Sequence, residues 1–97
     1  MIIYVDIDNT ITKTDGCDYE NAKPLYDRIK KINNLYDDNN IIVYWTARGS
    51  GSGKQLFKLT HEQLIFWGAK FHELRMGKPV FDIFIDDKAF NSDEYFN

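Results

Sequence analysis

Apolar residues along this chain fall into short runs separated by polar and glycine-containing segments, and the runs alternate between strand and helix patterns. The run at positions 2–5, with Ile7 close behind it, is β-branched and almost continuous, which is typical of a strand buried on both faces. Two further runs of this kind predict strands at 41–45 and 80–85. The stretch 69–74 has room for a short strand between them.

Two intervening segments have apolar residues at three- and four-residue steps, which is the spacing of amphipathic helices. The first is 21–36, which carries lysine and arginine on its other face and runs into turn-forming residues. The second lies within 54–67, where the run 60–63 matches a capping box at which the helix could start afresh. Gly68 then predicts its end.

The order strand, helix, strand, helix, strand, strand predicts a three-layer, Rossmann-like α/β domain with a mostly parallel sheet. We expect the aromatic and acidic tail at 90–96 to lie over the core. With 97 residues, of which 43% are hydrophobic, the chain fits a single domain, 1–97, with a small core. Ligands of such sheets bind beyond the carboxyl ends of the strands, so polar residues that follow strands are the candidates for function.

Charge and composition exclude several classes of function. A formal net charge of −3 and a pI of about 5.2 argue against a clamp for nucleic acid and against a binder of anionic membranes. Cys17 is the single cysteine, so an internal disulfide framework is excluded. No apolar run approaches the roughly 18 residues of a membrane span, and the apolar start is too short for a signal peptide. We therefore expect a cytoplasmic protein with no membrane partner.

Acidic residues follow two of the predicted strands. Asp6 and Asp8 come after the first strand, and Asp86 and Asp87 come after the last. Four carboxylates at one sheet edge repel one another, and their pKa values would rise unless a cation neutralises them. A hard divalent ion, Mg²⁺, is the natural solution where phosphate is also present. One aspartate can also serve as the nucleophile that forms an aspartyl-phosphate, while the other acts as acid and base.

Further polar residues suit a phosphoryl group. Thr46 follows the strand at 41–45 and can donate a hydroxyl hydrogen bond to a phosphate oxygen. Lys78 offers a positive charge that balances the aspartates and the transferring group, and Lys54 is its rival for this role. Arg48 either contacts substrate or is solvated, and the pattern favours neither alternative.

These motifs resemble those of the haloacid dehalogenase superfamily of phosphatases. The run Asp6-Ile7-Asp8-Asn9-Thr10 resembles its DxDxT first motif, Thr46 its second, Lys78 its third, and Asp86-Asp87 its fourth. The four motifs stand in the family's order, each with its expected strand context, and together they span nearly the whole chain. Members that act as dehalogenases lack the second aspartate of the first motif, so Asp8 points to phosphoester hydrolysis.

The resemblance implies a catalytic and metal-binding role for each aspartate. Asp6 would be the nucleophile and a Mg²⁺ ligand. Asp8 would protonate the leaving group, then activate the attacking water, and would bind Mg²⁺ through its backbone carbonyl. Asp86 would complete the metal site, with Asp87 assisting or replacing it, and which of the two touches the metal stays open.

The remaining positions would serve the phosphate. Thr46 and Lys78 would hold it together with Asn9, and Thr10 would brace the loop. Because the gaps 8–46 and 46–78 are too short for a cap domain, the resemblance is to a minimal, capless member. Such an open site suits a bulky substrate or a neighbouring subunit of a homo-oligomer as its lid.

A finer resemblance is carried by Gly77-Lys78-Pro79 and Ile85-Asp86-Asp87-Lys88-Ala89, among other positions. These look like short phosphatases associated with bacterial capsule or lipopolysaccharide loci. The implied substrate is a small phosphorylated sugar or another precursor of a surface polysaccharide.

Two alternatives stay open. The enzyme could act on a macromolecule, either a phosphoprotein or a nucleic-acid end, although the net charge disfavours nucleic acid. The chain could also be a receiver-like module that accepts a phosphoryl group without turnover. Motif order disfavours this second alternative, because the receiver lysine follows the last strand, whereas Lys78 precedes the strand predicted at 80–85.

Overall fold

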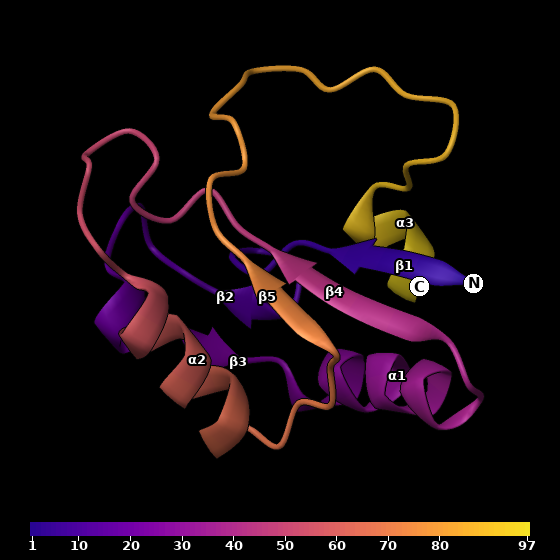
Figure 1. Cartoon of the computed structure of the whole chain (residues 1–97). Helices are drawn as coiled ribbons and strands as arrows, with labels where there is room; N and C mark the ends of the chain where they lie inside the picture. The colour runs from indigo at the N-terminus through magenta and orange to yellow at the C-terminus, as the bar shows by residue number, and fades with distance from the viewer.

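A sheet of three parallel strands forms the centre of the computed structural model, which describes all 97 residues (Figure 1). Its strands are β1 (Ile2–Val5), β4 (Ile41–Trp45) and β5 (Glu73–Arg75). They lie in the order β1-β4-β5, and both neighbouring pairs are parallel. The predicted α/β class with a mostly parallel sheet is confirmed, as are the strands predicted at 2–5 and 41–45.

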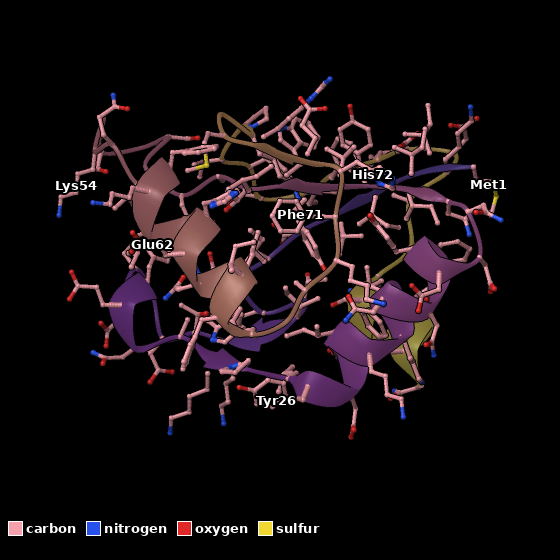
Figure 2. The ribbon with its side chains drawn as sticks, turned by 60° about the horizontal axis from the view of Figure 1, so that its bottom comes forward. Met1, Tyr26, Lys54, Glu62, Phe71 and His72 are labelled. Carbon is pink, nitrogen blue, oxygen red and sulfur yellow. The ribbon has the colours of Figure 1, made fainter.

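The helices α1 (Tyr26–Asp37) and α2 (Phe57–Phe66) pack on one face of this sheet (Figures 1 and 2), and α3 (Ser92–Phe96) lies by β1 and packs against α1. The crossovers β1-α1-β4 and β4-α2-β5 step in the same direction, and crossovers of one hand then place their helices on the same face. The prediction of three layers is therefore wrong: there are two, and the other face has exposed Ile2 and Tyr4 side chains.

The core lies between the sheet and these helices. The register sets Val5 beside Tyr44 and Tyr44 beside Leu74, so that three buried side chains form one row across the strands. Ile32 of α1 and Leu64 of α2 close over this row from the helix side. The strand ends, and with them the candidate residues, are thereby held in fixed positions.

The first helix begins later than its apolar spacing predicts. Residues 19–21 form a short 3₁₀ turn, η1, and Lys23–Pro24 forms the strand β3, which pairs antiparallel with β2 (Thr12–Lys13). Pro24 is the physical reason, because the residue before a proline is pushed toward extended backbone. The segment 12–24 is therefore a small hairpin, which we call the flap.

The second helix also differs from its expected start. It begins at Phe57, so that Thr60 lies inside it, and the Thr60 hydroxyl donates to the backbone oxygen of Leu56 instead of capping a new helix. Gly68 follows the helix with a φ of +75°, as its predicted role at the helix end requires.

The strand predicted at 80–85 is wrong. Residues 79–91, which we call the arm, run as an exposed excursion between β5 and α3 (Figure 1). The arm leaves the sheet at Lys78, whose N–H donates to the Thr46 oxygen just past the carboxyl end of β4. Two residues reach about 7 Å, whereas a return along a four-residue strand needs about 13 Å. The chain therefore cannot start a parallel strand at position 80.

The end of the chain returns to the core, as expected for the tail. Phe96 of α3 is buried, and the Lys31 side chain of α1 donates to its backbone oxygen. None of the helices combines the length and the apolar character that crossing a membrane would require.

A first prediction concerns Tyr44, whose buried hydroxyl has no hydrogen-bond partner. Burial raises the pKa of this phenol. Replacing Tyr44→Phe removes the unpaired group and keeps the ring, so the free energy of unfolding should rise by about 1 kcal/mol in denaturant titrations. Above about pH 10 the phenol loses its proton in the unfolded state but keeps it in the folded state, which lowers the stability of the wild type. The variant has no phenol, so it should lose less stability than the wild type in this pH range. A clear destabilisation would contradict this.

Candidate functional site

Asp6 stands at the carboxyl end of β1, at the start of a tight turn. The N–H groups of Thr10 and Ile11 both donate to the Ile7 oxygen, and Asn9 has a φ of +60°, in the left-handed region that asparagine tolerates. The Thr10 hydroxyl donates to Oδ2 of Asp6 over 3.2 Å. The turn therefore fixes one oxygen of the Asp6 carboxylate, and Thr10 lies where a loop-bracing residue is expected.

The structure brings Lys78 and Thr46 to the same sheet edge as Asp6. Lys78 Nζ lies 3.4 Å from Asp6 Oδ1, and its backbone N–H donates to the Thr46 oxygen over 3.1 Å. The Lys78 ammonium also lies 5.7 Å from the centre of the Trp45 ring, a cation–π contact. Lys54, the rival for this role, is exposed in the loop that precedes α2 (Figure 2).

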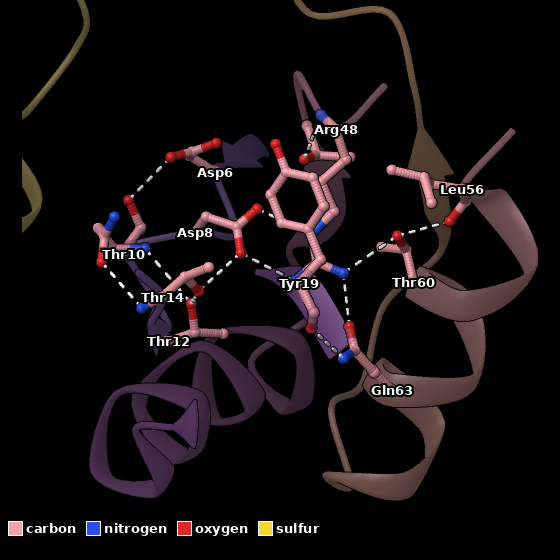
Figure 3. Close-up of polar contacts among 12 residues, drawn as sticks. Asp6, Asp8, Thr10, Thr12, Thr14, Tyr19, Arg48, Leu56, Thr60 and Gln63 are labelled. Atoms are coloured by element: carbon pink, nitrogen blue, oxygen red, sulfur yellow. Dashed lines mark hydrogen bonds and ion pairs between the residues drawn. The ribbon is translucent and has the colours of Figure 1, made fainter. Parts of the chain in front are cut away.

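Asp8 is held by a buried arginine (Figure 3). The Arg48 guanidinium donates to both of its oxygens, from Nε to Oδ2 and from Nη2 to Oδ1, each over 2.8 Å. The Thr14 hydroxyl donates to Oδ1 as well, also over 2.8 Å. The Arg48 side chain is 0% exposed, so it is neither solvated nor open to substrate, and neither sequence-based alternative describes it.

The remaining donors of Arg48 bind residues that the sequence analysis did not assign to the site. Nη1 donates to Thr60 Oγ1 and to Gln63 Oε1, and the Tyr19 ring lies 4.8 Å from the guanidinium carbon. Gln63 also donates to the Tyr19 backbone oxygen over 2.7 Å, which ties the flap to α2. Burial, and then a hydrogen bond with Cys17, raise the pKa of Tyr19 to about 12, so its hydroxyl stays neutral.

The sequence contains a pattern that indicates the partners of Arg48 on α2. Thr60 and Gln63 are three residues apart and therefore lie on the same side of α2, next to buried Leu64. Polar side chains on the inner face of a helix need partners, and here the partner is an arginine twelve residues earlier.

Asn9, expected at the phosphate, is engaged with the flap. Its side-chain oxygen accepts from the Thr14 N–H over 3.0 Å, and its own N–H donates to Thr12 Oγ1. The hydroxyls of Thr12 and Thr14 lie 2.6 Å apart. Asn9 therefore braces the loop against the flap through its side-chain oxygen. Its side-chain nitrogen, Nδ2, is the donor that is left for an anion.

The fourth expected motif is not at the site. Asp86 and Asp87 lie exposed on the arm, and no three carboxylate, histidine or cysteine side chains gather anywhere in the structure. Asp6 and Asp8 are the two acidic groups at this edge, and Asp8 is already paired with Arg48. The residues of one chain thus do not fit a complete Mg²⁺ site, and the expected convergence of four aspartates is wrong for a single chain.

Comparisons with known proteins give one structural match. No family model matches the chain, and no curated protein matches it. The crystal structure of an MCSG target from Vibrio cholerae is similar, with a TM-score of 0.87 and 27% sequence identity. The match covers 98% of this chain and 86% of that one. The likeness supports the arrangement of the elements along nearly the whole chain, and the name of that protein carries no activity.

A second prediction concerns the buried ion pair. Replacing Arg48→Met leaves Asp8 without its partner, so the free energy of unfolding should fall by about 3 kcal/mol or more. Arg75→Met is the matched control, because Arg75 pairs with Glu73 on the surface and is 51% exposed, and an exposed pair contributes at most about 1 kcal/mol. Denaturant titrations compare the two variants. Equal losses would contradict the role given to Arg48.

Proposed function

We propose that this protein is a phosphomonoester hydrolase, of the capless haloacid dehalogenase type, that works through an aspartyl-phosphate on Asp6. The observation that carries the proposal is the pairing of Asp6 with Lys78 at the carboxyl edge of a parallel sheet, next to Thr46. A carboxylate and an ammonium group 3.4 Å apart supply a nucleophile and a balancing charge for an incoming phosphoryl group.

The proposed reaction has two steps. In the first, an Asp6 oxygen bonds to phosphorus, the ester P–O bond breaks, and the leaving oxygen takes a proton from Asp8. In the second, water attacks the phosphorus, gives a proton to Asp8, and releases phosphate from Asp6. Lys78 balances the negative charge in both steps. Because Asp8 accepts three hydrogen bonds from Arg48 and Thr14, it must exchange one of them for each proton transfer.

Mg²⁺ remains part of the proposal as the cofactor that would neutralise phosphate and carboxylates together. Asp6 is the residue at this edge whose carboxylate would bind it, since Asp8 is paired in a bidentate way with Arg48. One chain does not provide the further oxygen ligands that a complete Mg²⁺ site needs.

The proposed substrate is a small phosphorylated sugar or another precursor of a surface polysaccharide. This part rests on the resemblance to short capsule and lipopolysaccharide phosphatases. A panel of sugar phosphates, phosphopeptides and 3′-phosphorylated oligonucleotides separates it from the macromolecular alternative. A long-lived acyl-phosphate without turnover would favour the receiver-like alternative.

A third prediction tests the nucleophile. Asp6→Asn should lower kcat for an aryl phosphate by at least about a thousandfold, because an amide cannot form the acyl-phosphate. Asp37→Asn is the matched control, since Asp37 lies at the end of α1 and pairs with Lys70 on the surface. The activity of this variant should be unchanged. Initial rates with p-nitrophenyl phosphate provide the measurement. Full activity of Asp6→Asn would overturn the assignment.

A fourth prediction tests the cofactor. Removing divalent cations with a chelator should stop turnover of the same aryl phosphate, and added Mg²⁺ should restore it. The fold should be unaffected, since the core is built from apolar side chains that bind no metal. Circular dichroism before and after chelation checks this. Undiminished turnover in excess chelator would contradict a role for Mg²⁺.

A further inference from the structure

The arm exposes apolar side chains that the rest of the chain covers only in part. The exposed side chains are Val80, Phe81, Ile83, Phe84, Ile85 and Phe90, and Ile85 is 93% exposed. Together they present on the order of 700 Å², which is close to the roughly 800 Å² that each partner contributes to a standard interface. A patch of this size is larger than a monomer normally leaves in water.

The backbone of the arm is unpaired as well. No backbone hydrogen bond involves any residue from 79 to 90, although the run 80–85 is rich in β-branched and aromatic residues. Such a run is suited to a strand, and it has no strand partner in its own chain.

An open strand edge is available on the other side of the sheet. β1 pairs with β4 along one side and with nothing along the other, so half of its peptide groups face outward. The side chains of Ile2 and Tyr4 are exposed on the open face of β1, where they would lie beside apolar side chains of an added strand. The opposite edge, β5, carries the charged Glu73 and Arg75, which discourage strand addition.

We propose that a second copy of this chain supplies the missing strand. Residues 80–85 of each copy pair, in the parallel sense, with the open edge of β1 in the other copy. The arm cannot do this in its own chain, because it leaves the sheet at the carboxyl ends of the strands and parallel strands need a crossover of about a dozen residues. A second copy has no such restriction, and the exchange is reciprocal, as in a closed two-fold dimer.

The exchange would also complete the candidate site. A parallel strand at 80–85 ends at the carboxyl edge, so Asp86 and Asp87 of the second copy would arrive beside Asp6. This consequence rests on the proposed function, and it supplies the carboxylates that a single chain does not gather there. The arm is then both an interface and a part of the site.

Light scattering on the purified protein tests the interface. At about 100 µM the wild type should have the mass of two 11.4 kDa chains, and Ile85→Lys should raise the dissociation constant at least tenfold. Ile65→Lys is the matched control, because Ile65 is exposed on α2, away from the arm. A monomeric wild type would overturn the proposal. This holds also if the amide groups of the arm are protected from hydrogen exchange, because the arm would then have found a partner within its own chain. Dissociation by Ile65→Lys but not by Ile85→Lys would do the same.

A mixing experiment tests the shared site. Asp6→Asn and the double variant Asp86→Asn/Asp87→Asn should each be inactive and dimeric. After subunit exchange, half of the dimers are mixed and hold one intact site each, so about a quarter of the wild-type activity should return. No recovery from exchanged, dimeric variants would overturn the shared site. An inactive wild type would refute the proposed function, and the mass measurement would still decide the interface.

Discussion

The ion pair between Arg48 and Asp8 is the constraint on which this end of the molecule depends. A buried guanidinium is costly unless its donors are paired, and here they bind the loop after β1, helix α2 and, through Gln63, the flap. Three parts of the chain that are distant in sequence, namely the loop after β1 with the adjoining flap, the segment of Arg48, and helix α2, must therefore meet at one point. That point lies at the carboxyl edge of the sheet, beside Asp6, so the same pair that stabilises the fold also orients the candidate acid and base.

The sequence predicted the parts of the site that follow from strand order. Asp6 and Thr46 each come at or just after the end of a buried run, and because parallel strands end at the same edge, their proximity could be predicted without coordinates. Lys78 could be placed there only through its motif. The burial of Arg48 could not be predicted, because it depends on partners as distant as Asp8 and Gln63 that no local pattern connects.

In the arm, the sequence pattern predicts a strand that the topology of the chain does not allow. The run 80–85 has the composition of a strand. Composition indicates only that a segment can form a strand, and it does not say whether the connection lets that segment reach a partner strand. Here the connection after Lys78 is too short for a parallel return, and the segment stays outside the sheet with its apolar side chains exposed. A chain of this size also has little core to spare, so burying such a surface between two copies would stabilise both.

The most direct test of Asp6 as the nucleophile is to look by mass spectrometry for a phosphoryl group bound to the protein during turnover. Wild-type protein is mixed with an aryl phosphate, quenched in acid, and digested for mass spectrometry. If Asp6 is the nucleophile, the peptide containing Asp6 carries one phosphoryl group, located on Asp6, and the same peptide from Asp6→Asn carries none. Turnover of the substrate with no phosphoryl adduct on Asp6, or with the adduct on another residue, would contradict this role of Asp6.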